Sequence, residues 1–197
     1  IKEAILAELA RGGQVYFLHN RIETIGHARE KLELLLARAG ARAPKIGVIH
    51  GRMDESNLIR TMECFREKEI DILLATTIIE NGLDLSNVNT LIVEDASRLG
   101  LSQAHQLRGR IGRGDRQAFA YFLYSPKKIT DTGKRRLETL KKYQNLGAGY
   151  EIAMRDLEIR GAGNILGREQ HGSINRVGLN LYCQILNEAV EELIKEA

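Results

Sequence analysis

Short apolar runs alternate with amphipathic stretches along the first 126 residues of the chain. The runs are rich in β-branched and aromatic side chains and are bounded by glycine, proline or polar residues, which is typical of buried strands. They predict five strands, at residues 14–18, 46–49, 71–75, 90–94 and 118–124.

The stretches between these runs carry apolar residues at helical spacing. Residues 1–12 have a helical composition, and Asn20 is a candidate cap for a second helix that would end at Gly40. Asp54 is expected to cap a third helix, and Ser102 to start a short fourth one. The expected apolar positions are Ile25, Ala28, Leu32, Leu35, Leu36 and Ala39 in the second helix, and Leu58, Ile59, Met62 and Phe65 in the third.

Apolar strands that alternate with amphipathic helices indicate an α/β fold, in which a parallel sheet has helices on both faces. Ligands of such sheets collect at the carboxyl ends of the strands. The expected ligand positions therefore follow strands directly: Asn20, the His50–Gly51 pair, Thr76 with Thr77, and residues 96–114.

The character of the sequence changes after Pro126, so we predict one domain over residues 1–126 and a second over 127–197. The second part begins with a basic helical stretch, 131–145, followed by a shorter helix at 151–157. Residues 160–172 form a glycine-rich polar loop of a length that usually carries function. An amphipathic helix over 180–196 closes the chain.

Composition limits the class of protein. The chain has 43% hydrophobic residues, enough for a real core, and no apolar run approaches a membrane span. Cys64 and Cys183 lie far apart and form no CxxC pair, so they are expected to be reduced thiols of a cytoplasmic protein. The five histidines show no metal-ligand spacing, so no metal site is predicted. Because the chain begins at Ile1 rather than Met, we expect a piece of a longer protein.

Positive charge is concentrated in the middle of the chain. Residues 105–142 hold eleven lysines and arginines against three acidic residues, whereas the net charge of the whole chain is only +3. A basic middle on an otherwise acidic chain is a candidate surface for a polyanion such as nucleic acid, although a solvated basic face has the same composition.

The stretch from Gln106 to Gly114 interleaves arginines with glycines. Arg110 and Arg113 are three residues apart, so on a helical turn they would share a face. Arginine offers a planar fork of donors suited to phosphate oxygens, and glycine lets a ligand approach closely. Taken alone, the stretch fits a phosphate site and a solvated basic loop equally well.

A second candidate site follows the third strand. The hydroxyls of Thr76 and Thr77 can donate to a backbone phosphate, and Gly82 and Asp84 place a carboxylate near a flexible backbone, where it could hold a ribose hydroxyl. Read alone, an ordinary strand-to-helix connection explains this segment better.

Together, the two candidate sites resemble the second RecA-like domain of superfamily-two helicases and translocases. In that family the positions of Gly82 and Asp84 belong to motif V, and those of Gln106, Arg110 and Arg113 to motif VI. The resemblance implies that Arg110 and Arg113 reach the γ-phosphate of an ATP bound on the first RecA-like domain. Arg113 best matches the arginine finger, which neutralises charge on the transferring phosphoryl group.

The same resemblance implies a track for one DNA strand. It assigns Thr76 and Thr77, with the turn formed by His50, Gly51 and Arg52, to contacts with the sugar-phosphate backbone. These contacts position DNA without reading its sequence.

Residues 156–172 resemble the translocation motif shared by RecG-like helicases and bacterial transcription-repair coupling factors. Arg160 and Gln170 are the residues expected to relay ATP-driven motion to duplex DNA. RecG-like chains usually carry a proline after the Arg-Gly pair, where this chain has Ala162, and this departure favours the coupling factors. The resemblance implies a double-stranded DNA translocase that displaces stalled RNA polymerase and recruits excision-repair proteins through modules outside this chain.

No G-x-x-x-x-G-K-[ST] loop occurs in the sequence, and no metal-binding strand end of the Walker B kind follows one. ATP and Mg²⁺ would therefore be held mainly by a preceding domain, and the 197 residues alone are predicted to be inactive. Two alternatives remain: a RecG-like fork-remodelling helicase, and a non-catalytic nucleic-acid-binding module that merely retains the fold.

Overall fold

The computed structural model of the chain describes residues 1–37, 43–76, 88–112, 116–143 and 148–160. These residues fall into two compact units. The first comprises residues 1–99 and 106–129, and the second comprises residues 100–105 and the chain from residue 130 onward. The division predicted at residue 126 stays a prediction.

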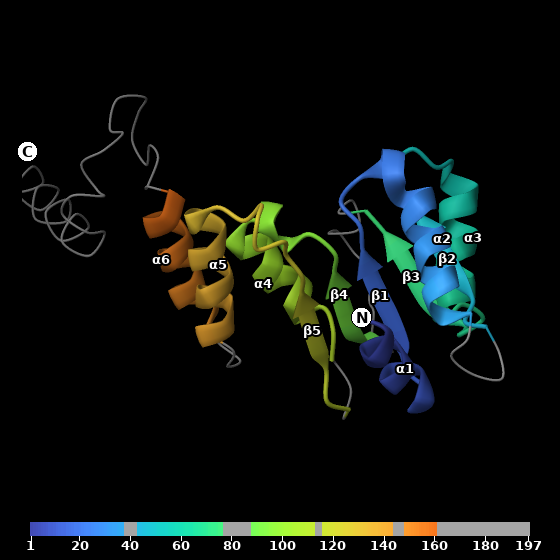
Figure 1. The fold of residues 1–197 in the computed structure, drawn as a ribbon. Helices are drawn as coiled ribbons and strands as arrows, with labels where there is room; N and C mark the ends of the chain where they lie inside the picture. Colours follow the sequence, from blue (N-terminus) through green and yellow to red (C-terminus); the bar gives the residue numbers. More distant parts are fainter. Residues whose placement is uncertain (38–42, 77–87, 113–115, 144–147, 161–197) are drawn as a thin grey trace, which may run out of the picture. The chain divides into compact units, whose positions relative to one another are not determined.

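The first unit is built on a five-stranded parallel sheet with the strand order β2-β3-β1-β4-β5 (Figure 1). All five predicted strands and the predicted α/β fold are confirmed. The central strands β1 and β3 are buried along their whole length, which explains why they are continuous apolar runs rather than alternating ones. The strands are β1 (Gln14–Leu18), β2 (Ile46–Ile49), β3 (Ile72–Ala75), β4 (Val88–Val93) and β5 (Phe119–Phe122).

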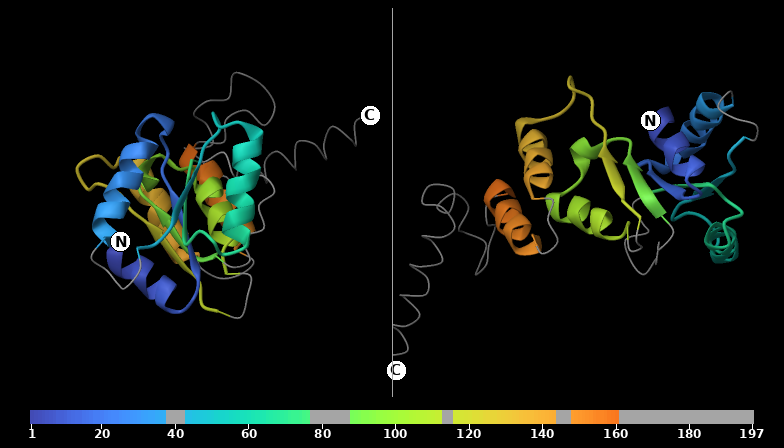
Figure 2. Two further views of the ribbon diagram at one scale, coloured as in Figure 1. Left: turned by 90° about the vertical axis from the view of Figure 1, so that its right-hand side faces the viewer. Right: turned by 90° about the horizontal axis from the view of Figure 1, so that it is seen from below.

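Helices cover both faces of this sheet, as predicted. Figure 2 shows α1 and α2 on one side of the sheet and α3 on the other. Two short 3-10 helices, η1 and η3, follow β1 and β4. Helix α4 belongs to both units, because its first five residues are part of the second unit. The helices are α1 (Lys2–Ala10), η1 (Ile22–Thr24), α2 (Ile25–Leu36), α3 (Glu55–Arg66), η3 (Ala96–Arg98) and α4 (Leu101–Gly109).

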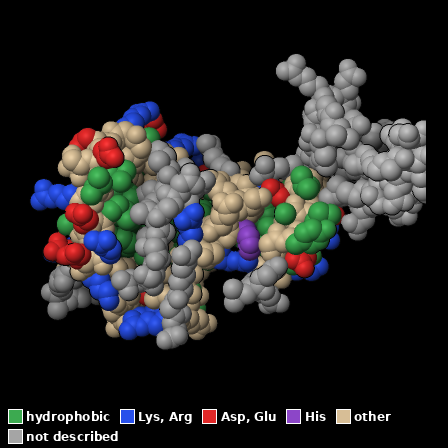
Figure 3. All heavy atoms as spheres, turned by 180° about the vertical axis from the view of Figure 1, so that it is seen from behind, with side chains coloured by type: hydrophobic (Ala, Val, Ile, Leu, Met, Phe, Trp, Pro, Cys, Tyr) green, Lys and Arg blue, Asp and Glu red, His purple; other side chains and the backbone are tan. Residues whose placement is uncertain are grey.

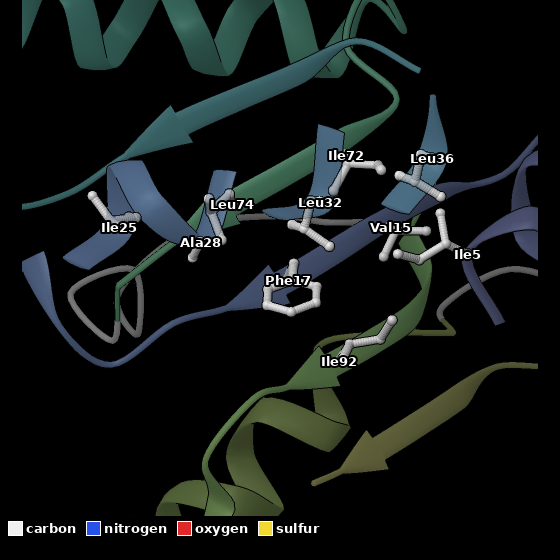
Figure 4. Close-up of a cluster of buried hydrophobic side chains, with 10 residues drawn as sticks. All are labelled: Ile5, Val15, Phe17, Ile25, Ala28, Leu32, Leu36, Ile72, Leu74 and Ile92. Carbon is white, nitrogen blue, oxygen red and sulfur yellow. The ribbon is translucent and has the colours of Figure 1, made fainter. Parts of the chain in front are cut away.

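The main core lies between the sheet and the helices α1 and α2 (Figure 4). Alternate residues of the strands point to this side, and the parallel register aligns Val15 with Ile72 and Phe17 with Leu74. Each fully buried side chain of this size contributes about 1.5–3 kcal/mol of transfer free energy. The core residues are Ile5, Val15, Phe17, Ile25, Ala28, Leu32, Leu36, Ile72, Leu74 and Ile92.

The structure matches the expected helix caps and apolar positions only in part. Asn20 does not cap α2; its side-chain amide donates to the main-chain oxygen of Asp95 at 3.4 Å, and Thr24 occupies the N-cap position instead. Leu35 is 39% exposed and Ile59 48% exposed, because the helical turn carries them away from the buried stripes of α2 and α3. Asp54 does occupy the N-cap position of α3, as expected, and its carboxylate accepts hydrogen bonds from the side chains of Ser56 and Asn57.

The second unit contains a pair of packed helices, α5 (Asp131–Lys142) and α6 (Gly149–Arg160). Both predicted helices are therefore confirmed. Thr130 caps α5 by accepting a hydrogen bond from the Gly133 amide at 3.1 Å. Leu140 of α5 and Ile152 of α6 are buried hydrophobic residues of this pair, and Ala148, just before α6, is buried as well.

Residues 100–105, at the start of α4, join this unit through a buried polar contact. The hydroxyl of Ser102 donates to the carboxylate of Asp156 at 2.7 Å, and Asp156 is only 6% exposed. Hydrophobic side chains also lie at the surface of the unit (Figure 3), where Tyr150 is 73% exposed and Leu157 38%. The predicted loop at 160–172, apart from residue 160, and the predicted helix at 180–196 lie outside the described residues.

Candidate nucleic-acid and nucleotide interface

Thr76 stands at the carboxyl end of β3, directly after the buried strand that positions it. Its main-chain N–H donates to the oxygen of Ile49 at 3.2 Å, which ties it to the end of β2. The residue is 3% exposed, and its hydroxyl oxygen is buried with no hydrogen-bond partner among the described residues. A buried hydroxyl is normally satisfied, so this one has donor and acceptor capacity left for a ligand.

The His50–Gly51–Arg52 turn follows β2 at the same edge. The ring nitrogen Nδ1 of His50 accepts a hydrogen bond from the Arg52 main-chain N–H at 3.3 Å, and the oxygen of His50 accepts from Met53 at 3.1 Å. The guanidinium of Arg52 lies 3.1 Å from the carboxylate of Glu23 and remains largely exposed. A main-chain hydrogen bond and the nearby Arg52 lower the pKa of Glu23.

Two further side chains complete this carboxyl edge, and neither was in the predicted site. His19, after β1, contacts the carboxylate of Glu94, after β4, through Nδ1, and its Nε2 lies 2.7 Å from the hydroxyl of Thr24. Beside it, the side-chain oxygen of Asn20 is buried without a partner among the described residues. The sequence signal that could have found His19 and Glu94 is their position directly after a strand.

The arginine stretch begins at the end of α4. Gln106 is exposed in the last turn, Leu107 is buried, and burial lowers the pKa of the Arg108 guanidinium. The helix ends at Gly109, so Arg110 lies beyond it, half-buried, with its N–H donating to the oxygen of Leu107 at 3.2 Å. Arg113 lies outside the described residues, so the expectation that it shares a face with Arg110 stays a prediction.

Gly112 places the end of this stretch at the opposite edge of the sheet. Its N–H donates to the oxygen of Val88, the first residue of β4, at 3.2 Å. Its φ is +73°, and a Cβ at this position would overlap the Cβ of Ala118, so only glycine fits without strain. The segment 96–114 was expected at the carboxyl edge. Only its start lies there, where the Ala96 N–H donates to the oxygen of Leu123.

The structure thus separates the predicted site residues into two sets. His50, Gly51, Arg52 and Thr76 lie at the carboxyl edge, and the segment that contains Arg110 reaches the amino edge. The segment 77–87 joins the carboxyl end of β3 to the amino end of β4. Several predicted site residues lie outside the described residues or have undescribed side chains: Thr77, Gly82, Asp84, Arg113, Gln170 and the side chain of Arg160.

The described part of the chain contains no group of three His, Cys, Asp or Glu side chains that could hold a metal ion. It also has no helix long and apolar enough to cross a membrane. The predicted nucleotide-contacting residues that the structure describes are the half-buried Arg110, a cation, and the exposed Gln106, a neutral amide. This chemistry fits the phosphates of ATP and contributes nothing to a Mg²⁺ ligand set.

Comparisons with known proteins identify similar sequences. Curated relatives include the transcription-repair-coupling factors of Staphylococcus haemolyticus, 53% identical, and Bacillus subtilis, 52% identical. Both matches extend over 193 residues and 98% of this chain, but the chain spans only 16% of each relative's length.

Among solved structures, RecG bound to a three-way DNA junction matches 82% of this chain and 21% of its own, with 33% identity and a TM-score of 0.68. The model of the helicase conserved C-terminal domain matches residues 1–115, more than half of the chain. Strands β1 to β4 and the arginine stretch lie within that range, whereas β5 lies beyond it. The chain therefore belongs to the family of helicase conserved C-terminal domains.

Proposed function

We propose that this chain is the C-terminal half of the ATP-driven motor of a double-stranded DNA translocase. The observation that carries the proposal is the separation of the two candidate sets, which lie at opposite edges of one sheet and both contain side chains that can bind phosphate. A translocase needs two separate surfaces, because one must respond to the state of the bound nucleotide while the other binds the DNA along which the protein moves.

The carboxyl edge would hold one DNA strand. The unpartnered hydroxyl of Thr76 can donate to a phosphate oxygen, and the exposed Arg52 guanidinium can approach the same strand. Gly51 is exposed in the same turn, and Thr77, which lies outside the described residues, would contact the same strand. Because these contacts involve only the sugar-phosphate backbone, the DNA affinity would be independent of sequence and would decrease as the salt concentration rises.

Residues at the amino edge of the sheet would contact ATP. When bound, ATP supplies the phosphoanhydride bond whose cleavage drives the motor. Arg110 and Arg113 would neutralise the negative charge that develops on the phosphoryl group, while Gln106 orients the nucleotide and Gly82 with Asp84 holds its sugar. The Lys-bearing loop and the Mg²⁺ carboxylate would come from a preceding RecA-like domain, because no such motif occurs in this sequence.

The second unit would transmit motion to duplex DNA. Its helices α5 and α6 pack into a hairpin that leads into Arg160, and we assign Arg160 and Gln170 to the relay. On this proposal, residues 1–126 form the motor domain and residues 127–197 form the translocation element.

The biological role follows from the similarity to transcription-repair-coupling factors. We place the chain in a cytoplasmic protein that pushes a stalled RNA polymerase off damaged DNA and brings excision-repair proteins to the lesion. Contacts with polymerase and repair proteins would be made by modules outside these residues.

The test uses the full-length protein that carries this chain. DNA-stimulated ATP hydrolysis, displacement of a triplex-forming strand and release of a stalled polymerase are measured for the wild type and for Arg113→Ala. We expect the wild type to perform all three reactions, and the variant to lose all three while still binding ATP. A wild type that releases no polymerase and displaces no triplex strand would overturn the proposal.

The isolated 197 residues are expected to show no ATP hydrolysis above background, with or without DNA. Clear DNA-stimulated turnover by the purified chain would contradict the assignment of the ATP cradle to another domain.

A RecG-like fork-remodelling helicase is the second candidate, because the similarity to RecG covers 82% of the chain. The two functions share a motor and differ in substrate. Fork regression without release of a stalled polymerase would favour the RecG-like function. A non-catalytic nucleic-acid module is the third reading, and an inactive full-length protein would favour it.

A further inference from the structure

Helix α1 buries a carboxylate that neither candidate set uses. Glu8 is 1% exposed, although a glutamate is rarely buried unless it is paired. Its Oε2 accepts hydrogen bonds from the Arg11 guanidinium and from the hydroxyl of Thr90 in β4. Its Oε1 is buried with no partner among the described residues. Glu8 therefore joins α1 to β4 near the amino edge of the sheet.

The local backbone is shaped around this carboxylate. A Cβ added at Gly13 would overlap Oε1 of Glu8 and come within 2.7 Å of its carboxyl carbon. The N–H of Gly13 also donates to the main-chain oxygen of Glu8 at 3.0 Å. The turn between α1 and β1 thus has room for the buried side chain only because residue 13 is glycine.

Arg11 extends the connection to the arginine stretch. Its guanidinium lies over the ring of Phe119, the first residue of β5, 5.3 Å from the ring centre. Its main-chain oxygen accepts a hydrogen bond from Arg116, 105 residues away in sequence. Arg116 itself is exposed and lies two residues after Gly114, the last residue of the arginine stretch.

The arginine stretch is consequently anchored on both described flanks. Before residues 113–115, Gly112 is bound to Val88; after them, Arg116 is bound to Arg11, which Glu8 holds. Both anchors lead to β4, one through its first residue and the other through Thr90.

We propose that Glu8, Arg11 and Arg116 are positioning residues for the ATP-directed arginines, forming one network that ties the chain just after the arginine stretch to the amino edge of the sheet. This inference rests on the proposed function. None of the three needs to touch ATP. Their contribution is to hold the stretch in place while charge develops on the phosphoryl group, where small displacements are costly.

A positioning role predicts a specific kinetic change. Interactions that matter only in the transition state alter kcat, whereas uniform binding of substrate alters KM. Removing the hydrogen bond between Arg116 and Arg11 should therefore lower kcat for ATP hydrolysis and leave the KM for ATP nearly unchanged. Since a displacement of about 1 Å can cost about 100-fold, we expect a loss of roughly 10-fold for a partly released stretch.

The experiment measures DNA-stimulated ATP hydrolysis by the full-length protein in its wild-type, Arg116→Met and Arg116→Lys forms. Arg116 is exposed, so its replacement is compatible with folding. Lysine keeps a donor for the oxygen of Arg11 and should restore most of the turnover that methionine loses. Arg29→Met is the matched control, because Arg29 forms an exposed ion pair with Glu33 on the surface of α2 and should leave kcat unchanged.

A second variant tests the buried end of the network. Glu8→Gln keeps an oxygen that can accept from Thr90 and removes the charge that holds Arg11. If Glu8 acts through Arg116, the double variant with Arg116→Met should be no slower than Arg116→Met alone, since residues in one network are not additive. The stoichiometry of ATP binding, measured for each variant, separates lost turnover from lost folded protein.

The outcomes separate this inference from the proposed function. Lower kcat with unchanged KM in Arg116→Met, and recovery in Arg116→Lys, support the positioning role. An active wild type whose kcat is unchanged by Arg116→Met overturns the positioning role alone. Multiplicative losses in the double variant overturn the single network. A wild type without DNA-stimulated hydrolysis overturns the proposed function and the positioning role with it.

Discussion

Gly112 donates its main-chain N–H to the oxygen of Val88 at 3.2 Å, and this bond places the end of the arginine stretch beside the first residue of β4. The start of the same connection is bound to Leu123, at the carboxyl end of β5. The chain between β4 and β5 therefore crosses the whole sheet. Arg110 consequently lies near the edge opposite to Thr76.

Replacing Gly112 with alanine should destabilise the first unit. The residue has a φ of +73°, which costs a side-chain-bearing residue about 1–2 kcal/mol, and the new Cβ would overlap Ala118. We expect a loss of about 2–3 kcal/mol in the free energy of unfolding, measured by chemical denaturation.

The matched control for this variant is Gly26→Ala. Gly26 lies inside α2 with nothing within 4 Å of an added Cβ, so alanine should stabilise the helix by about 0.5–1 kcal/mol. Equal effects of the two substitutions would show that the backbone conformation at residue 112 is not constrained.

The contact between Ser102 and Asp156 gives a prediction for the second unit. Ser102→Ala removes a donor at 2.7 Å from a carboxylate that is 6% exposed, and hydrogen bonds to charged groups contribute about 1.5–3 kcal/mol. Amide hydrogen exchange in α6 should therefore become faster. Ser56→Ala removes a similar but exposed bond to Asp54 and should leave exchange in α3 almost unchanged. Unaltered protection of α6 in Ser102→Ala would refute the structural role of this contact.

Substitutions in the proposed relay should separate hydrolysis from movement. In the full-length protein, Arg160→Ala and Gln170→Ala should keep DNA-stimulated ATP hydrolysis within about 3-fold of wild type, less than about 1 kcal/mol in barrier height. Both should lose displacement of a triplex-forming strand. Survival of strand displacement in both variants would move the relay elsewhere.

The sheet was predictable because burial on both faces leaves a plain signal. β1 and β3 are continuous apolar runs, and their helices carry apolar stripes with one-turn spacing. Leu35 and Ile59 share the helical spacing of the apolar residues yet are exposed, because local periodicity alone does not fix which residues of a helix meet the sheet. Tertiary contacts decide that.

The arrangement of the candidate site was only partly predictable. The carboxyl-edge positions follow strands, so His50 and Thr76 could be proposed from chain order. The amino-edge position of the arginine stretch depends on the length and direction of α4 and on the bond between Gly112 and Val88. Glu8 was missed because a glutamate in an amphipathic helix is ordinarily exposed, and its partner Thr90 is 82 residues away.

The most direct test of the two-edge arrangement compares Thr76→Val with Arg110→Ala in the full-length protein, with ATP turnover measured as a function of DNA concentration. Valine keeps the volume of Thr76 and removes a hydroxyl that has no partner among the described residues. The Thr76→Val variant should need a roughly 3- to 10-fold higher DNA concentration for half-maximal stimulation, because it loses the free energy of about one hydrogen bond. Its kcat at saturating DNA should be unchanged. Arg110→Ala should do the reverse, lowering kcat at saturating DNA by at least about 10-fold with an unchanged half-maximal DNA concentration. If Thr76→Val lowered kcat and Arg110→Ala weakened DNA stimulation, the assignment of the two edges would be contradicted.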